Sequence, residues 1–315
     1  MRHVLIDTDP GVDDALALIL ALRSPELKVE AITTVSGNLD IQTVSRNALK
    51  LLEFLGIENV PVAMGAAKPL CREPRRASDF HGNAGLGDAI LPEPKLKQDS
   101  RTAFEAIRET AECYGEELTI VALGPLTNIA VNIMENPDVM ENVSGLTIMG
   151  GAYGLTPYGI GNVNAVAEYN IWHDPEAAKV VFESGIPIKA FGLDVTSDPK
   201  NRLSKEMFVD VCNLRGRNAE LVSKLCGGIV KRNDGMSLHD PLTMAAVIKP
   251  GMAKLEKYLV KVETMGKYTL GMTVVDRRPN RCDEEPNVDV CTSVDGKMFH
   301  DVFMNRVVGG PEGKC

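Results

Sequence analysis

Four carboxylates are crowded into one short stretch near the amino terminus of the chain. They are Asp7, at the end of an apolar run, and Asp9, Asp13 and Asp14, around the turn that follows it. Carboxylates this close repel one another and are costly to bury. A cation removes both costs, and an all-oxygen ligand set favours a hard ion, Ca²⁺ or Mg²⁺. Capping of the next helix would explain one or two of these carboxylates, but not Asp7 and Asp9 at the strand end.

A second polar stretch, residues 161–170, brings three amides and a carboxylate together. Its members are Asn162, Asn164, Glu168 and Asn170. Amides both donate and accept hydrogen bonds, so the set suits the several hydroxyl groups of a sugar. An ordinary surface loop rich in Asn and Gly has the same composition, and that alternative stays open. We expect Asn38, which follows another apolar run, to join the same set.

A third group, residues 237–241, places His239 beside Asp240. We interpret the aspartate as a further metal ligand and the histidine as a proton donor, whose ordinary pKa of about 6.5 suits neutral pH. His-Asp-Pro is also a common helix start, so capping is the alternative. His81, in a glycine-rich segment, is predicted to face a pocket. The other histidines are expected to be structural or exposed: His3, His173 and His300.

Aromatic side chains that could stack on a ring-shaped ligand are predicted in loops near these groups. The candidates are Phe80, Tyr153 and Tyr158. Trp172, the single tryptophan, is expected to pack in the core instead, because it lies between an apolar residue and a helix start.

Strands and helices must alternate to position these residues. Strands are predicted at residues 3–8, 29–35, 60–64, 118–123, 145–149 and 187–193. Helices are predicted at residues 13–23, 41–55, 101–113, 126–134 and 175–183. After residue 200 the pattern predicts helices at 204–214, 219–231, 240–247 and 298–307, and strands at 258–263, 269–275 and 288–294. This order predicts an α/β fold, a Rossmann-like and mainly parallel central sheet flanked by helices. Ligands of such sheets bind beyond the carboxyl ends of the strands, where the polar residues fall.

Composition narrows the class of protein. The 315 residues carry a net charge of −9 and no block of Lys and Arg, which argues against nucleic-acid binding. No signal-peptide pattern or membrane-spanning apolar run occurs, so we expect a soluble, cytoplasmic protein without a membrane partner. No linker divides the chain, which predicts one domain over residues 1–310 and a short tail at 311–315. The seven cysteines lack metal-binding spacing and are expected to be reduced, with a Cys282–Cys291 pair left open.

From residue 4 to about residue 303 the chain resembles the nucleoside hydrolases, the inosine–uridine-preferring ribohydrolases. The most specific motif is DTDPGVDDALAL at 7–18. Further matching segments are ITTVSGN at 32–38, HGNAGL at 81–86, LGPLTNIA at 123–130, IMGGAY at 148–153, AEYNIWHDPEAA at 167–178, GLDVT at 192–196, LHDP at 238–241 and TLGMTVVD at 269–276. The resemblance implies Ca²⁺-dependent hydrolysis of the N-glycosidic bond of ribonucleosides to ribose and free base, with inosine and uridine, or pyrimidine nucleosides, as expected substrates. It also implies a homo-oligomer, either dimer or tetramer.

The resemblance assigns roles to individual residues. The implied metal ligands are the carboxylates of Asp9, Asp14 and Asp240 and the backbone carbonyl of Leu123. Asp9 would also be the general base, and His239 the acid that protonates the leaving base. The implied ribose-binding positions are Asp13, Asn38, Asn162, Glu168 and Asn170, with Met149 lining the sugar pocket. One departure is visible: several relatives carry tyrosines before the LHDP motif, whereas residues 223–237 have none and are glycine-rich. The base pocket and the route of the proton are therefore left open.

Two other functions compete with this interpretation. The Asp7-Thr8-Asp9 sequence imitates the start of the haloacid dehalogenase phosphohydrolase motif, but Gly11 stands where that motif needs Thr or Val. A non-catalytic ribose- or nucleoside-binding protein would need the sugar-binding residues, but neither Asp9 as a base nor His239 as an acid.

Overall fold

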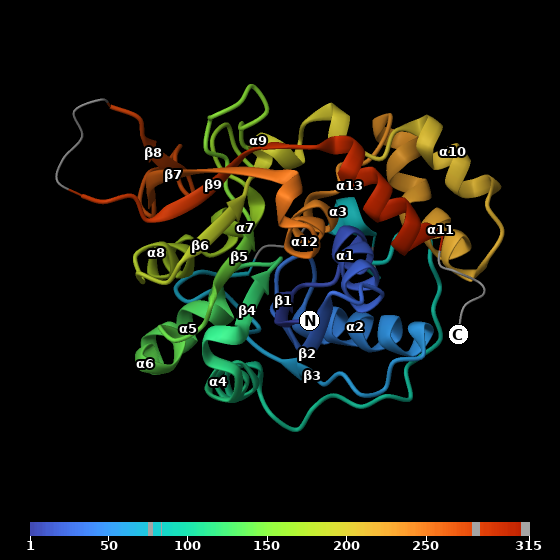
Figure 1. Ribbon diagram of the computed structural model, residues 1–315, viewed down its shortest axis with the longest axis horizontal. Helices are drawn as coiled ribbons and strands as arrows, with labels where there is room; N and C mark the ends of the chain where they lie inside the picture. Colours follow the sequence, from blue (N-terminus) through green and yellow to red (C-terminus); the bar gives the residue numbers. More distant parts are fainter. Residues whose placement is uncertain (75–77, 83, 279–283, 310–315) are drawn as a thin grey trace.

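A mainly parallel sheet with helices on both faces forms the centre of the computed structural model, which describes residues 1–74, 78–82, 84–278 and 284–309 (Figure 1). The strands are β1 (Arg2–Thr8), β2 (Leu27–Thr34), β3 (Val62–Met64), β4 (Leu118–Ala122), β5 (Gly145–Met149), β6 (Ile188–Phe191), β7 (Ala253–Val262), β8 (Thr273–Asp276) and β9 (Val288–Val294). Their order is β3-β2-β1-β4-β5-β6-β9-β7-β8. Strand β7 runs antiparallel to both β8 and β9, whereas the other pairs are parallel. The predicted α/β fold class is confirmed.

The connection order of this sheet reverses at β1. The chain runs outward from β1 to β2 and β3, then returns to place β4 on the other side of β1. Where the order reverses, the loops after two adjacent parallel strands diverge and leave a crevice for a ligand. The turn with the crowded carboxylates follows β1, and Leu123 follows β4, so the fold delivers both to this crevice.

Two helical layers cover the sheet. The helices are α1 (Val12–Leu22), α2 (Ile41–Leu55), α3 (Ser78–His81), α4 (Ala103–Tyr114), α5 (Thr127–Glu135), α6 (Pro137–Met140), α7 (Tyr169–His173), α8 (Pro175–Phe182), α9 (Leu193–Thr196), α10 (Lys205–Asn213), α11 (Arg217–Asn233), α12 (His239–Ile248) and α13 (Gly296–Phe303). Helices α1, α2, α11, α12 and α13 share one core cluster with the sheet, and α4, α5 and α8 share the other. Figure 1 shows these two groups on opposite sides of the strands.

After the two aspartates of its first turn, helix α1 is apolar on every side, and its residues from Val12 to Ala21 are all buried. A helix of this kind must be enclosed by protein, and α1 packs against α12 as well as against the sheet. This burial holds the acidic amino-terminal end of α1 in place beside the start of α12. Both helices therefore present carboxylates to the same crevice.

Several predicted elements differ in their bounds from those observed, and three of the differences have a clear physical reason. The strand predicted at 269–275 begins only at Thr273, because residues before it form a turn in which Gly271 has φ +79° and donates its N–H to the Glu263 carbonyl (2.8 Å). Strand β7 begins at Ala253 rather than at residue 258, since the charged residues of its first half interrupt the apolar pattern. The last helix ends at Phe303 and continues as a π-helical turn over Met304–Val308.

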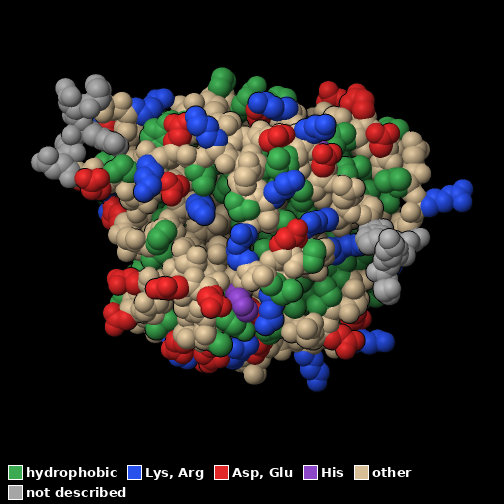
Figure 2. All heavy atoms as spheres, viewed as in Figure 1, with side chains coloured by type: hydrophobic (Ala, Val, Ile, Leu, Met, Phe, Trp, Pro, Cys, Tyr) green, Lys and Arg blue, Asp and Glu red, His purple; other side chains and the backbone are tan. Residues whose placement is uncertain are grey.

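Some predictions fall on other parts of the chain. The tail at residues 311–315 and the cysteine at position 282 lie outside the described residues. Within the described ranges, every helix is too short or too polar to cross a membrane. On the face shown in Figure 2, acidic and basic side chains are interspersed, and the described part of that face carries no broad basic surface.

Candidate active site

A cavity of about 370 Å³ lies where the loops after the strands meet the start of α12. Its size suits a small organic ligand. Of the residues to which the resemblance assigns roles, all except Asp9 and Asp14 line it. The lining residues are Asp13, Asn38, Phe80, His81, Leu123, Met149, Asn162, Val163, Glu168, Tyr169, Asn170, His239 and Asp240. Segments distant in sequence therefore come together as the motifs predicted.

Asp14 lies under the floor of this cavity and is held by four donors. Its Oδ1 accepts hydrogen bonds from the Thr8 hydroxyl (2.6 Å) and the Asp9 N–H (3.2 Å). Its Oδ2 accepts from the Gly11 N–H (3.0 Å) and the Asn38 side-chain amide (3.1 Å). The carboxylate thus closes the turn after β1 onto the first turn of α1, where the helix dipole favours a negative charge.

Three carboxylates gather at the crevice. Asp13, Asp14 and Asp240 are buried, and each offers an oxygen within 4.8 Å of the oxygens of the others. Burial, followed by repulsion from Asp14, raises the pKa of Asp13 to about 8. Burial and repulsion from Asp13 and Asp14 raise the pKa of Asp240 well above its usual range. These buried carboxyl groups lose their protons together more easily when a positive charge lies between them. Their oxygens are the ligands that a hard divalent cation prefers.

Asp9 is buried beside this group but outside that set of three. Its Oδ2 accepts the Asn38 backbone N–H (2.6 Å). Two glycines leave room for the carboxylate: a Cβ at Gly37 would overlap Oδ2, and a Cβ at Gly124 would lie 2.7 Å from Oδ1. Burial first, and then repulsion from Asp14, raises the pKa of Asp9 well above its usual range. The surroundings therefore orient Asp9 and increase its basicity.

Asp7, counted with the acidic turn in the sequence, is separate from the cavity. It is fully buried, and its Oδ1 accepts hydrogen bonds from the Thr33 hydroxyl (2.6 Å) and the Asn128 amide (2.8 Å). Its Oδ2 has no partner among the described residues. Burial raises the pKa of Asp7 to about 7. The side chain ties together β1, β2 and α5, and it is not placed to bind a metal with the other carboxylates.

The side of the cavity predicted to hold a sugar is formed by α7 and the loop before it. Glu168 caps α7, because its carboxylate accepts the N–H groups of Asn170 (2.8 Å) and Ile171 (3.1 Å). The Asn170 amide donates to the carbonyls of Leu123 (2.7 Å) and Met149 (3.1 Å). These bonds lock Glu168 and Asn170 in place at the cavity wall. The Leu123 carbonyl, the predicted metal ligand, already accepts one hydrogen bond there.

Asn164 was predicted to belong to the same set, and this interpretation is wrong. Its Oδ1 accepts the N–H groups of Val166 and Ala167 (both 2.9 Å), and its amide donates to the Leu270 carbonyl (3.1 Å). The side chain closes its own turn, as Asn side chains commonly do. It therefore shapes the loop that carries Asn162 and Val163 and does not line the cavity.

Two histidines line the cavity, and burial changes the acidity of both. The Val12 N–H donates to His81 Nδ1 (3.1 Å), so the proton of neutral His81 is on Nε2. His239 Nδ1 is hydrogen-bonded to the Thr196 hydroxyl (2.8 Å). Burial lowers the pKa of each ring to about 4, and the His239 pKa is lowered further by repulsion from His81, when that ring is protonated, and from Arg202. The ordinary histidine pKa expected from the sequence is wrong here, since both rings are neutral at pH 7.

The aromatic predictions are met in part. Phe80 lines the cavity and is 37% exposed. Tyr153 is buried and donates its hydroxyl to the Gly150 carbonyl (3.0 Å), so it packs beneath the site instead of stacking on a ligand. Tyr158 and Trp172 do not line the cavity. Sequence reasoning missed Tyr169, whose hydroxyl donates to the Gly37 carbonyl (2.7 Å), and Val163. The position of Tyr169 between Glu168 and Asn170 was the available signal.

Comparisons with known proteins match this chain to nucleoside hydrolases, both in sequence and in structure. The family described as inosine-uridine preferring nucleoside hydrolase matches residues 4–301. Uridine nucleosidase 1 of Arabidopsis thaliana is 41% identical over 88% of this chain and 82% of its own. The pyrimidine-specific ribonucleoside hydrolase RihA of Salmonella paratyphi C is 41% identical over 96% of this chain and 97% of its own. Among solved structures, the plant nucleoside hydrolase PpNRh1 has a TM-score of 0.90 and 33% identity, covering 98% of this chain and 99% of its own. The purine-preferring ribonucleoside hydrolase from Gardnerella vaginalis has a TM-score of 0.88 and 31% identity, covering 98% of both chains.

Proposed function

The chain belongs to the inosine-uridine preferring nucleoside hydrolase family, and from this premise we propose that it is a Ca²⁺-dependent enzyme that prefers pyrimidine ribonucleosides. Hydrolysis of an N-glycosyl bond follows from the family itself, whereas the ion and the preferred base are the proposal. The observation that supports a bound metal ion is the group of three buried carboxylates, Asp13, Asp14 and Asp240, whose oxygens lie within 4.8 Å of one another. The preference for pyrimidines is supported by the names of the relatives at about 40% identity, which exceed the purine-preferring structure in identity.

The metal would be held by the carboxylates at the crevice. Asp14 and Asp240 fit this role by position, together with Asp9 and the Leu123 carbonyl at the ends of the two central strands. Asp13 is near enough to bind either the ion or a substrate hydroxyl. When bound, Ca²⁺ would hold sugar hydroxyls and a water molecule and make that water more acidic.

Asp9 is the proposed general base. Its raised pKa makes its carboxylate a better proton acceptor, and the Asn38 N–H and the two neighbouring glycines fix its direction. A base held in this way removes the proton of an attacking water without first having to reorient. Cleavage of an N-glycosyl bond develops positive charge on the ribose, and the buried negative charge of Glu168 stabilises that charge. Amides of Asn38, Asn162 and Asn170 are the proposed partners of the ribose hydroxyls.

His239 is the proposed donor to the departing base. Because burial keeps the ring neutral, His239 would assist by a hydrogen bond from its ring N–H and not as an imidazolium in the resting enzyme. When the Thr196 hydroxyl donates to Nδ1, the proton of neutral His239 is on Nε2. His81, whose proton is also on Nε2, offers a second donor at the same cavity.

A panel of substrates tests this proposal. Uridine, cytidine, inosine and adenosine are incubated with the enzyme, and release of the free base is measured with added Ca²⁺ and after its removal by a chelator. We expect uridine or cytidine to be cleaved fastest, with activity lost on chelation and restored by Ca²⁺. Faster cleavage of inosine would contradict the proposed preference, and full activity of rigorously metal-free enzyme would contradict the proposed ion.

The same assay addresses the competing functions. A phosphohydrolase would release nitrophenol from nitrophenyl phosphate, and a binding protein would release no base from any nucleoside. The family match over residues 4–301 leaves the phosphohydrolase without support. A homo-oligomer in the cytoplasm stays our expectation, and the mass in solution from light scattering tests the first part of it.

A further inference from the structure

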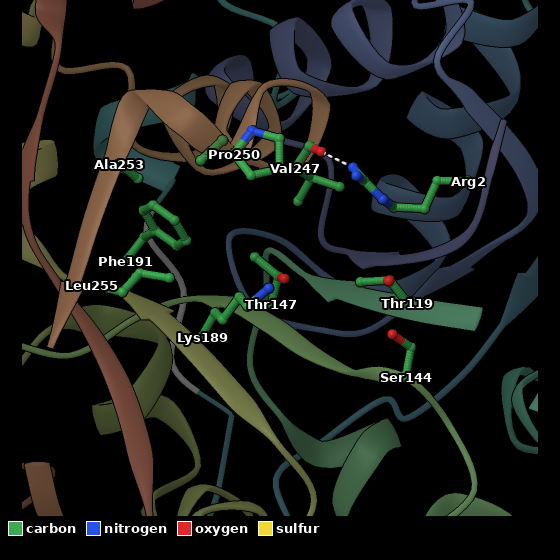
Figure 3. A pocket seen from close by; sticks show the side chains of 11 residues that line it. Arg2, Thr119, Ser144, Thr147, Lys189, Phe191, Val247, Pro250, Ala253 and Leu255 are labelled. Atoms are coloured by element: carbon green, nitrogen blue, oxygen red, sulfur yellow. Dashed lines mark hydrogen bonds between the residues drawn. The ribbon is translucent and has the colours of Figure 1, made fainter. Parts of the chain in front are cut away.

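A second cavity, of about 130 Å³, lies on the side of the sheet that α12 covers, at the opposite end of the strands from the candidate active site (Figure 3). Its polar lining comes from Arg2, Thr119, Ser144, Thr147 and Lys189. Arg2 begins β1, and Thr119 and Lys189 are the second residues of β4 and β6. Its apolar wall consists of Phe191, Ala246, Val247, Pro250, Ala253 and Leu255. This arrangement places two cations and three hydroxyls around one space.

The charge of this cavity is positive although the chain as a whole carries −9. No carboxylate is among its lining residues. The Arg2 guanidinium donates to the Val247 carbonyl, which accounts for one of its five N–H groups. In the described part of the chain, the Lys189 ammonium has neither an ion pair nor a hydrogen bond. Asp289 is beside Lys189 in the sheet register but also beside Lys257, and it forms an ion pair with neither among the described residues.

Thr147 is the buried member of the set. Only 5% of its surface is exposed, and it lies in register with Lys189 on the adjacent strand. Among the described residues, its hydroxyl has no hydrogen-bond partner, and the same holds for the Thr119 hydroxyl. The Thr147 hydroxyl is not among the fully enclosed polar atoms that lack a partner, so it faces the open space of the cavity and is available to a molecule bound there. Figure 3 shows Thr147 and Lys189 beside each other on the sheet, with the Arg2 guanidinium across the space from them, directed at the Val247 carbonyl.

We propose that this cavity binds an oxyanion of the phosphate class, either inorganic phosphate or the phosphate group of a small metabolite. Every polar group around the space can donate a hydrogen bond, and phosphate is an acceptor on all sides. Guanidinium and ammonium groups form charge-assisted bonds with such anions, which are stronger than bonds between neutral groups. The exposed Ser144, Lys189 and Pro250 form the mouth of the cavity and leave a path for entry.

This site is separate from the candidate active site but shares α12 with it. His239 and Asp240 begin the helix at the active site, and Val247, whose carbonyl accepts the Arg2 hydrogen bond, lies near its end. The two cavities are therefore lined by different residues, and binding of phosphate can be measured without substrate or metal.

Calorimetric titration of metal-free, full-length protein with inorganic phosphate tests the proposal, and a parallel titration with glycerol phosphate distinguishes the two sources. We expect the wild type to bind at least one of them. Lys189→Gln should weaken binding by roughly tenfold or more, because a charge-assisted bond is worth at least one decade of affinity. Thr147→Val, which preserves the shape of the buried side chain, should weaken it by a few-fold. Lys257→Gln, which removes an exposed lysine of β7 outside the cavity, is the matched control and should bind as the wild type does.

Failure of the wild type to bind either compound would overturn the proposal, and so would equal affinity in the wild type and both cavity variants. If Lys189→Gln does not fold, the Thr147→Val comparison decides. Selective binding of inorganic phosphate would identify the free ion as the ligand, and tighter binding of glycerol phosphate would identify a phosphorylated metabolite.

Discussion

Raising the pH from 5 to 7 should destabilise the metal-free protein more than it destabilises the Asp13→Asn variant. Asp13 is buried at the crevice, and burial and repulsion from Asp14 raise its pKa to about 8. In the unfolded chain an aspartate has a pKa of about 3.9. The native state therefore keeps a proton that the unfolded state releases, and the stability tied to this proton is present at low pH and lost as the pH rises toward 8.

The size of the effect follows from this difference in bound protons. One retained proton changes the free energy of unfolding by about 1.4 kcal/mol per pH unit, so two units correspond to about 3 kcal/mol. At roughly 2.1 cal/mol/K of unfolding entropy per residue, this is a fall in Tm of about 4 °C for a chain of this length. His81 and His239, with pKa values lowered to about 4, act in the opposite direction below about pH 6.5. The difference between wild type and Asp13→Asn isolates the contribution of Asp13.

Thermal unfolding followed between pH 5 and 8 measures this difference. Asp138→Asn, at an exposed position on α6, is the matched control and should follow the wild type. Added Ca²⁺ should stabilise the wild type more at pH 7 than at pH 5, because protons compete with the ion for the same carboxylates. Parallel pH curves for wild type and Asp13→Asn would refute the assignment of a buried, protonated carboxyl at Asp13.

Three further predictions concern the reaction. Gly37→Ala should lower kcat for uridine by roughly 10²-fold, within the usual contribution of a general base, because the added Cβ would overlap the Asp9 carboxylate. Gly251→Ala, where a Cβ meets nothing within 4 Å, is the control. Equal activity of both variants would contradict the proposed placement of Asp9. Deoxyuridine should be cleaved roughly 10⁴-fold more slowly than uridine, since loss of the 2′-hydroxyl leaves buried polar groups unpaired, and comparable steady-state rates would exclude a role for that hydroxyl. His239→Ala should slow uridine cleavage by about 10²–10⁴-fold but leave a nitrophenyl riboside nearly unaffected, because its leaving group is stable as an anion; equal losses would show that His239 supports the structure of the site.

Much of the fold could be predicted from the sequence, because its signals are local. An apolar run followed by a turn and an amphipathic or apolar helix produces a strand and a crossover helix wherever it occurs. The order of these elements was sufficient to predict a parallel sheet, and the carboxyl ends of parallel strands meet at one edge of the sheet. The motifs after β1, β2 and β4 were therefore expected to converge, and the cavity contains one residue from each of them, Asp13, Asn38 and Leu123.

The tertiary structure alone decided what each polar side chain does. Asn162 and Asn164 are the same type of residue in the same short segment, yet only Asn162 lines the cavity, while Asn164 closes its own turn. Likewise, Asp7 is isolated beside Asn128, whereas Asp13 lies near Asp240 from a distant helix. Hydrogen-bond partners and burial are set by packing between segments that the local pattern does not relate.

The pKa values of the site residues were also set by the tertiary structure. His239 and Asp9 could be predicted from the sequence as an acid and a base, but the ordinary pKa of a free side chain was the only acidity that could be assigned to them. Enclosure by α1, α12 and the surrounding loops removes water from these groups, which lowers the pKa of His239 and raises that of Asp9. Desolvation depends on every element packed around a charge, so it exists only once the chain has folded.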